Sequence, residues 1–460
     1  MDMIELRKFH SVYFIGIGGI SMSALAEILH ARGMEVRGYD RSSSRLTEHL
    51  ESLGIRVWYA EDHRPEAFDG VDLVCYTAAV TQDHPQMALA AQTGVPVISR
   101  AELLGCIASS YPLSVAVAGT HGKSTTSGML AHIMLQSDAC DPTFVVGAVV
   151  PDVDSTFRIG TDAHCVFEAC EYKDSFLSFY PETAVVLNIE LDHTDYFRSI
   201  EQMIESFRIF LSHTGENGTA IVNADNENCA KALEGYTGHV VTFGIRDTSA
   251  DYTAANIDLS DGYGSFDVRF RGEPLFRAKL RIPGIHNVSN ALAATAAAHR
   301  AGIPPEAIRS GLAAYKGVNR RFEHIGTASG ADFYDDYAHH PDEIKATLAA
   351  AKGIAKGRVI CAFQPHNYSR LRDLYTDFGG AFRDADELIL TKLYAPREAA
   401  QEDYTSEKLA SLIGATYIDE LDDITPYLLS IARPGDVILY MGAGSIEKEA
   451  RKFKKMQNNA

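Results

Sequence analysis

The sequence has few of the features that mark secreted or membrane proteins. Its 460 residues include seven cysteines, an odd number, and no C-x-x-C pair of the metal-binding kind. We therefore expect free thiols in a reducing compartment. No run reaches the roughly 18 apolar residues of a membrane span. Residues 1–10 lack the basic start, apolar middle and cleavage site of a signal peptide. These absences predict a cytoplasmic protein without membrane insertion.

The sequence also contains fewer basic than acidic residues. Lys and Arg number 42 against 61 Asp and Glu, which gives a net charge of -19. Such a surface repels nucleic acid phosphates unless a basic stripe overrides it, and the sequence shows no such stripe. We therefore predict no nucleic acid partner. Small anions remain possible ligands, because salt screens a distant surface charge within about 10 Å.

The order of apolar segments along the chain predicts an α/β protein. A chain of 460 residues is too long for one hydrophobic core and indicates two to four domains. Short β-rich runs alternate with amphipathic stretches, as in mostly parallel sheets covered by helices. Expected strands include Val12–Ile17, Leu113–Ala118 and Asp332–Asp336. The pattern falls into three blocks, which we bound at 1–111, 112–317 and 318–460.

The clearest local signal is a glycine-rich loop at the start of the second block. Gly119-Thr120-His121-Gly122-Lys123-Ser124 follows an apolar strand and precedes a helical stretch. Backbone N–H groups and a helix N-terminus can cradle phosphate there, while the lysine neutralises phosphate oxygens and the serine holds Mg²⁺. The longer form of this motif has glycine at 117, where this chain has Val117. The competing interpretation is a turn with a solvated lysine, and the strand–loop–helix order favours nucleotide binding.

Several polar residues follow the expected strands of the second and third blocks. Glu168 and Asp192-His193 would lie at the carboxyl edge of the central sheet, where ligands bind in such folds. Asn287 and Asn290 flank a helix start, while Arg321 and Asp336 stand at the start of the third block. Their spacing alone also fits helix caps and ordinary surface residues. Sequence pattern by itself leaves both interpretations open.

A second glycine-rich segment near the N-terminus permits an alternative from another class. Gly16, Gly18 and Gly19, with Asp40 at the end of a later strand, fit part of the dinucleotide-binding fingerprint. Ser21 stands where that fingerprint has its third glycine. An NAD-binding oxidoreductase therefore competes with a UDP site for this segment. The oxidoreductase leaves the phosphate loop and the third block without explanation.

Taken together, the motifs resemble the Mur ligase family over essentially the whole chain. The segments that carry the resemblance are GTHGKS at 119–124, Glu168, 188–193, 286–290, 320–322 and DDYAHHP at 335–341. The resemblance implies an N-terminal Rossmann-like domain for the UDP part, a central P-loop ATPase-type sheet and a C-terminal Rossmann-like domain for the amino acid. Residues 16–23, the double histidine and 363–366 are similar to the branch that joins L-alanine to UDP-N-acetylmuramate during peptidoglycan assembly.

The resemblance also implies a reaction and roles for named residues. ATP, with Mg²⁺ as cofactor, would phosphorylate the substrate carboxylate, and the alanine amine would displace the phosphate. The implied catalytic residues are Lys123, Glu168, His193, Asn287, Asn290, Arg321 and Asp336. The implied binding residues are Gly119, Thr120, His121, Gly122, Lys123, Ser124 and Thr125 for ATP; Gly16, Gly18, Gly19, Ser21 and Asp40 for the UDP substrate; Tyr337, His339 and Arg370 for the amino acid; and Ser124, Glu168 and His193 for the metal.

Some departures and alternatives accompany this resemblance. Several relatives carry a carbamylated lysine after the segment matching His193, whereas the basic residues here are Arg198 and Arg208, which cannot form that group. Asn367 stands where some relatives have arginine. A recycling ligase that attaches a preformed murein peptide would share nearly all these motifs. A non-catalytic ATP-dependent switch is a third possibility, and the chain could be a monomer or a homodimer.

Overall fold

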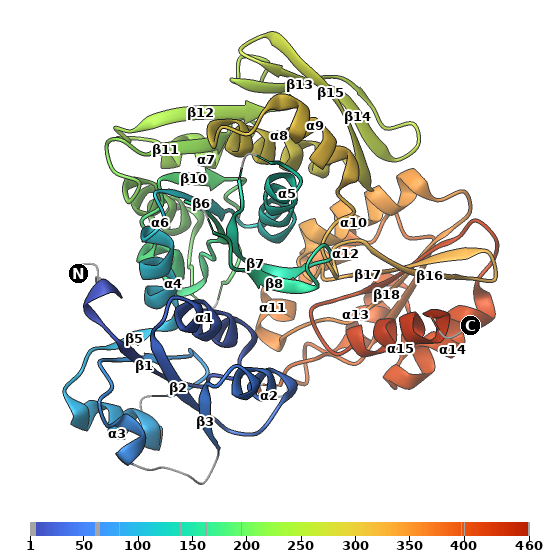
Figure 1. Cartoon of the computed structure of the whole chain (residues 1–460). Coiled ribbons are helices and arrows are strands. Elements are labelled where there is room, and N and C mark those ends of the chain that lie inside the picture. Colours follow the sequence, from blue (N-terminus) through green and yellow to red (C-terminus); the bar gives the residue numbers. More distant parts are fainter. Residues whose placement is uncertain are drawn as a thin grey trace.

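The computed structural model describes residues 6–59, 65–81, 83–138, 140–161, 163–194, 196–396, 398–399 and 401–458. Residues 1–5, half of the segment considered above for a signal peptide, lie outside this range. The described residues form three sheets, one for each block of the sequence. The sheets succeed one another from blue through green to red in Figure 1.

The first sheet is parallel and has the strand order β3-β2-β1-β4-β5. Its strands are β1 (Ser11–Ile15), β2 (Glu35–Asp40), β3 (Arg56–Tyr59), β4 (Leu73–Tyr76) and β5 (Val97–Ser99). Its helices are η1 (Leu6–Lys8), α1 (Ile20–Ala31), α2 (Arg45–Ser52), η2 (Pro65–Phe68), α3 (Pro85–Thr93) and α4 (Arg100–Ser109). Alternate residues of β1 face two different hydrophobic cores. Val12 and Phe14 belong to one core, and Tyr13 and Ile15 belong to the other. Both faces are therefore covered, as expected for a parallel sheet.

The central sheet has ten strands in the order β15-β14-β13-β12-β11-β10-β6-β9-β7-β8. They are β6 (Leu113–Ala118), β7 (Thr143–Val150), β8 (Ser155–Arg158), β9 (His164–Glu168), β10 (Thr183–Val186), β11 (Thr219–Asn223), β12 (His239–Gly244), β13 (Tyr252–Asp258), β14 (Tyr263–Phe270) and β15 (Glu273–Pro283). Its helices are α5 (Lys123–Leu135), η3 (Tyr172–Ser178), α6 (Ile200–Ser212), α7 (Glu227–Ala232), α8 (Ile285–Arg300) and α9 (Pro305–Ala314). The strand β6 runs parallel to its neighbours β9 and β10, so the ends of all three meet at one edge.

The third sheet has the order β16-β17-β21-β18-β19-β20 and is parallel except for β16. Its strands are β16 (Glu323–Ala328), β17 (Ala331–Asp336), β18 (Val359–Phe363), β19 (Glu387–Thr391), β20 (Thr416–Ile418) and β21 (Val437–Met441). Its helices are α10 (Pro341–Ile354), α11 (Tyr368–Asp373), α12 (Tyr375–Ala381), α13 (Ser406–Ile413), η4 (Leu421–Asp423), α14 (Ile424–Ile431) and α15 (Glu447–Asn458). The β17–α10 connection carries the DDYAHHP motif.

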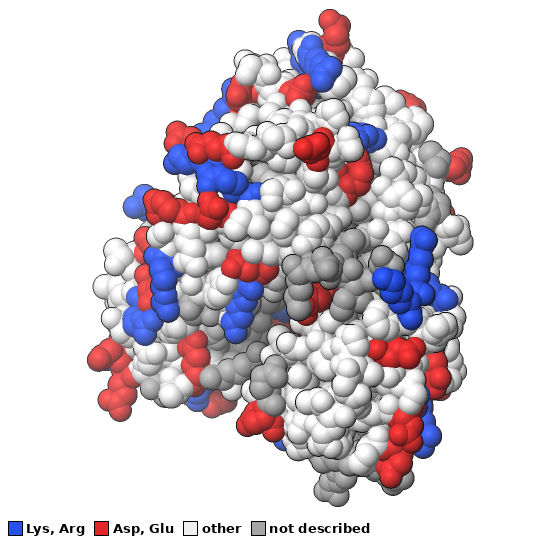
Figure 2. All heavy atoms as spheres, turned by 90° about the vertical axis from the view of Figure 1, so that its left-hand side faces the viewer, with Lys and Arg blue, Asp and Glu red and all other residues white. Residues whose placement is uncertain are grey.

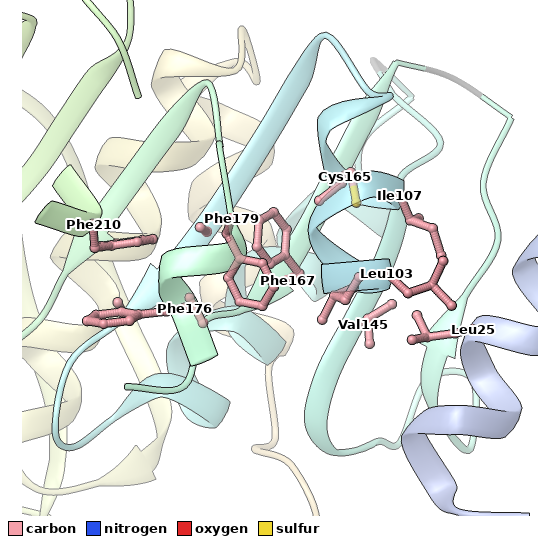
Figure 3. Close-up of a cluster of buried hydrophobic side chains, with 14 of the residues drawn as sticks. Leu25, Leu103, Ile107, Val145, Cys165, Phe167, Phe176, Phe179 and Phe210 are labelled. Atoms are coloured by element: carbon pink, nitrogen blue, oxygen red, sulfur yellow. The ribbon is translucent and has the colours of Figure 1, made fainter. Parts of the chain in front are cut away.

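A continuous apolar core joins the first sheet to the central one. Leu25 of α1 and Leu103 of α4 belong to the same buried cluster as Val145 and Phe167 of the central sheet (Figure 3). Phe167 packs edge-on against Phe179 with ring centroids 5.1 Å apart. Because each aromatic side chain buries a large apolar area, this core fixes α1 and the turn before it next to the central sheet.

The structure confirms the predicted fold class of three α/β domains with mostly parallel sheets. The boundaries at 111 and 317 stay predictions. None of the seven cysteines, all of which lie among the described residues, forms a disulfide, as expected. On the face drawn in Figure 2, Lys and Arg are interspersed with Asp and Glu. In the part of the chain that the structure describes, no helix is long and apolar enough to cross a membrane.

Candidate active site

The phosphate loop connects β6 to α5, as the sequence predicts. Gly119 and Gly122 have φ values of 139° and 86°, which only glycine adopts without strain. A Cβ at Gly122 would lie 2.7 Å from Asn290 Oδ1, so α8 leaves no room for a side chain. The side chain of Asn188 clamps the loop: its Oδ1 accepts from the His121 N–H at 2.8 Å, and its Nδ2 donates to the His121 carbonyl at 3.0 Å.

The lysine of the loop has a carboxylate partner that sequence reasoning missed. Lys123 Nζ lies 2.9 Å from Glu171 Oε2, and the Glu171 side chain is fully buried. Glu171 Oε1 in turn lies 3.6 Å from His193 Nε2. Burial opposes charge on both groups, but their mutual attraction outweighs it: the pKa of Lys123 is raised and that of Glu171 is lowered. The position of Glu171 three residues beyond the end of β9 was the available signal.

Oxygen-bearing side chains surround the first turn of α5. Ser124 is the second residue of that helix, and Glu168 ends β9, the strand next to β6. Glu168 Oε2 accepts a hydrogen bond from the Gly147 N–H at 2.9 Å. Hydroxyl and carboxylate oxygens are ligands that Mg²⁺ prefers, so this donor set fits the metal. Among the described residues, no group of three or more His, Cys, Asp and Glu side chains is placed to hold a metal ion by itself.

A cavity of about 370 Å³ opens beside the loop, between the central and C-terminal domains. Its lining includes His121, Asn287 and Asn290 from the central domain and Arg321, Asp336 and Glu343 from the C-terminal domain. The two asparagines are joined by a hydrogen bond of 3.0 Å. Both oxygens of Asp336 are occupied, one by the Phe322 N–H and the other by the Ala338 N–H. Burial raises the pKa of Asp336, and Arg321 opposes the rise.

The residues expected to face the amino acid lie where the central and C-terminal domains meet. The ring of Tyr337 packs edge-on against His339 at 5.3 Å and lies under the guanidinium of Arg321 at 5.0 Å. Burial lowers the pKa of His339 to about 3, so its imidazole is neutral at physiological pH. Arg370 Nη2 lies 3.7 Å from Asp192 Oδ1 of the central domain. The guanidinium thus already has a carboxylate partner.

A second cavity, of about 480 Å³, has walls from all three domains. Ile20 comes from α1, Ser124 from the phosphate loop, Gly147 from β7, and Arg320 and Tyr337 from the C-terminal domain. Ile20 is 63% exposed although it is large and apolar. This space therefore connects the glycine-rich turn of the first domain with the phosphate loop.

The five residues predicted to bind the UDP part lie in that glycine-rich turn, at the start of α1 and at the end of β2. Gly16 has a φ of 84°, and Gly19 is the N-cap of α1. The Gly18 N–H donates to Asp40 Oδ2 at 2.7 Å, which ties the turn to the end of β2. Ser21 Oγ accepts from Arg100 at 3.1 Å. The turn thus offers the backbone of a helix N-terminus to a phosphate.

The structure therefore gathers the predicted residues into two groups. The phosphate loop, Glu168, His193, Asn287, Asn290, Arg321 and Asp336 surround the interface of the central and C-terminal domains, with Tyr337, His339 and Arg370 beside them. Gly16, Gly18 and Gly19 of the glycine-rich turn, Ser21 of α1 and Asp40 at the end of β2 form a separate group in the first domain. Their chemical roles stay predictions.

Comparisons with known proteins cover nearly the whole chain. Family models match residues 11–112 ("Mur ligase family, catalytic domain"), 117–298 ("Mur ligase middle domain") and 320–444 ("Mur ligase, glutamate ligase domain"). A protein of Acetivibrio thermocellus named UDP-N-acetylmuramate--L-alanine ligase is 44% identical over 461 aligned residues, 99% of this chain and 98% of that protein.

Two solved structures share this architecture. The UDP-N-acetylmuramate-alanine ligase of Thermotoga maritima superimposes with a TM-score of 0.78 and 27% identity, over 98% of this chain and all of that one (100%). The murein peptide ligase of Psychrobacter arcticus gives a TM-score of 0.71 at 24% identity, over 98% of this chain and 99% of that one. The second likeness shows a common fold and nothing more specific.

Proposed function

This chain belongs to the Mur ligase family, and we propose that it uses ATP to join L-alanine to UDP-N-acetylmuramate, a step of peptidoglycan synthesis. The observation that carries the proposal is the 44% identity over 99% of the chain to a relative of that name. The three-domain cavity next to the phosphate loop supports it, because such a ligase must bring three substrates to one point.

The chemistry requires activation of a carboxylate. A carboxylate oxygen of the UDP sugar attacks the γ-phosphorus of ATP, the bond to ADP breaks, and an acyl phosphate forms. The alanine amine then attacks the acyl carbon, loses a proton, and expels inorganic phosphate. Positioning and electrostatic stabilisation supply the rate, because the protein itself contributes no covalent step.

In our proposal the phosphate loop holds ATP. The N–H groups at the start of α5 and the ammonium of Lys123 would neutralise the β and γ phosphates, and Glu171 would position Lys123 by its 2.9 Å ion pair. Asn287, Asn290 and Asp336 line the adjacent 370 Å³ cavity, which we assign to the rest of the nucleotide. Arg321 reaches that cavity from the other domain and would approach the transferring phosphoryl group.

We assign Mg²⁺ to Ser124, Glu168 and His193. When bound, the ion would draw charge from the phosphate oxygens and so favour attack at phosphorus. Glu168 is oriented by the Gly147 N–H and His193 by the Glu171 carboxylate, so both side chains are held at the edge of the sheet. Orienting groups of this kind support metal ligands in general.

We assign the UDP part to the Gly16–Ser21 turn and the amino acid to Tyr337, His339 and Arg370. The neutral imidazole of His339 beside Tyr337 suits a small uncharged side chain such as that of alanine. The −19 net charge and the seven cysteines outside disulfides agree with a cytoplasmic enzyme of small anionic substrates and without a nucleic acid partner.

A substrate-omission assay tests the proposal. Phosphate release by the purified protein with ATP and Mg²⁺ should require both UDP-N-acetylmuramate and L-alanine. Release without an amine would indicate an ATP-dependent switch. Faster release with a murein tripeptide than with alanine would assign the protein to the recycling branch, and NADH binding at the Gly16–Ser21 turn would favour the oxidoreductase alternative.

A further inference from the structure

One glutamate of the C-terminal domain touches the phosphate loop of the central domain. Glu343, in the first turn of α10, has its Oε1 3.4 Å from His121 Nδ1 and 3.6 Å from Arg321 Nη1. Its side chain is 13% exposed. This contact crosses the boundary between the central and C-terminal domains.

Both the backbone and the ring of His121 are held by neighbouring residues. Its main chain is clamped by Asn188, and its Nε2 lies 3.4 Å from Glu190 Oε2, opposite to Glu343. With a carboxylate at each ring nitrogen, the imidazole carries a positive charge. Burial alone lowers its pKa, but the two glutamates raise it to about 10. A displacement of Glu343 therefore removes one of the two carboxylates that contact the His121 ring of the phosphate loop.

The same carboxylate is bound to the loop that we assign to alanine. Glu343 Oε2 lies 3.3 Å from His339 Nδ1, and it accepts the backbone N–H of His339 at 3.1 Å. With His340 it forms the capping box of α10. A shift of either Glu343 or His339 would therefore stretch or break these contacts.

We infer that Glu343 is a positioning residue that couples the ATP site to the amino-acid site, so that alanine bound at His339 strengthens nucleotide binding at the His121 loop. The inference rests on the proposed function for the identity of both ligands. Two sites are coupled when both bias one element with two arrangements. Here that element is the Glu343 contact between the domains, which joins the His121 loop to the His339 loop.

The experiment measures the dissociation constant of AMP-PNP, with Mg²⁺ and saturating UDP-N-acetylmuramate, in the presence and absence of L-alanine. For the wild type we expect alanine to tighten AMP-PNP binding at least about fivefold, the lower end of usual coupling. In Glu343→Gln, which keeps the volume but removes the charge, the change should fall below about twofold. Glu306→Gln removes another first-turn glutamate paired with an arginine, outside both cavities, and should keep the wild-type change.

His121→Gln leaves the α10 cap intact and gives a second route if Glu343→Gln unfolds. It should also reduce the alanine effect, and the double variant should lose no more than Glu343→Gln alone, because the His121 contact runs through Glu343. A full alanine effect in either single variant, or no alanine effect in the wild type, overturns the inference. Ligation by the wild type, measured in parallel, reports separately on the proposed function.

Discussion

At the scale of single residues, the buried Lys123–Glu171 ion pair leads to a prediction about stability that the phosphate loop motif alone does not give. Lys123→Ala removes the proposed phosphate contact and leaves Glu171 buried beside His193, 3.6 Å away. Stranding one member of a buried ion pair typically costs roughly 3–5 kcal/mol. We therefore expect lost phosphate release together with a lower urea midpoint.

The double variant Lys123→Ala/Glu171→Gln separates the two effects. It should regain much of the stability, because the stranded charge is gone, and none of the activity. Far-UV circular dichroism in urea and a phosphate-release assay check both. A Lys123→Ala protein as stable as the wild type would show that Glu171 does not depend on the lysine.

Asp335 should make the stability of the fold depend on pH. Burial raises its pKa from 3.8 to about 7, despite Arg320 at 3.6 Å. The native state therefore binds a proton that the unfolded state releases, so stability falls as pH rises from about 4 to 7 and the loss is complete above pH 7. Asp335→Asn removes this penalty, while Arg320 keeps its contacts with Glu447 and the Gly442 carbonyl.

Each unit of the rise in pKa corresponds to roughly 1.4 kcal/mol, and only part of that total should appear as stability. We therefore expect Asp335→Asn to stabilise the protein by about 2 kcal/mol at pH 8. The gain should shrink towards zero at pH 4. Thermal unfolding at several pH values measures it. A gain of equal size at pH 4 and pH 8 would exclude titration of Asp335 as its cause.

Residue types and spacing were enough to find the phosphate loop, but not its partners. Residues 119–124 can be recognised from sequence because a glycine–lysine loop after a strand typically binds phosphate. Glu171 and Glu343 do not, because a lone glutamate in sequence reads as a surface residue and only the fold brings it to Lys123 or His121. Arg370, which the resemblance assigns to the amino acid, lies 3.7 Å from Asp192 of a different domain, a partner that sequence alone could not reveal.

At the scale of elements, the close approach of α4 to η3 holds the segment that follows Glu171. A Cβ at Gly105 of α4 would lie 2.1 Å from the Ser178 carbonyl oxygen at the end of η3. Gly105→Ala must therefore push the two elements apart, and such overpacking typically costs about 1–3 kcal/mol.

Gly379 of α12 is the matched control, since a Cβ there meets nothing within 4 Å. Gly379→Ala should be neutral or slightly stabilising because alanine favours helix. Thermal unfolding of both variants measures the difference. Equal melting temperatures for the two would mean that α4 and η3 can separate without cost.

Elements with strong periodic patterns were predicted nearly to their ends. The expected strand Leu113–Ala118 matches β6, and the expected strand Asp332–Asp336 lies within β17, Ala331–Asp336. The predicted strand Val12–Ile17 ends at Ile15, because Gly16 takes a positive φ and starts the turn. The pairing of strands into sheets could not be read from sequence, because it depends on contacts between distant segments.

At the scale of the whole molecule, the Arg370–Asp192 contact links the proposed amino-acid site to the central domain. A guanidinium grips a carboxylate through two parallel N–H bonds, whereas lysine offers a point charge. If Arg370 exchanges its Asp192 contact for the alanine carboxylate, Arg370→Lys should raise the alanine KM at least about tenfold and change the ATP KM little. An unchanged alanine KM would leave Arg370 with only its structural contact to Asp192.

Alanine selectivity is expected to be incomplete. A small pocket separates neighbours that differ by a methyl or hydroxyl by about 1–3 kcal/mol. Glycine and serine should therefore react slowly, with lower kcat/KM than alanine in the same phosphate-release assay. Equal kcat/KM values for all three amino acids would argue against a shaped pocket at Tyr337 and His339.

The central claim is that this three-domain protein activates a carboxylate with ATP before an amine displaces the phosphate. The most direct measurement uses UDP-N-acetylmuramate labelled with ¹⁸O in its carboxylate, together with ATP, Mg²⁺ and L-alanine. Mass spectrometry should find one ¹⁸O in the inorganic phosphate for each amide formed, because the attacking carboxylate oxygen leaves with the phosphoryl group. Phosphate without ¹⁸O, released while amide accumulates, would contradict the account.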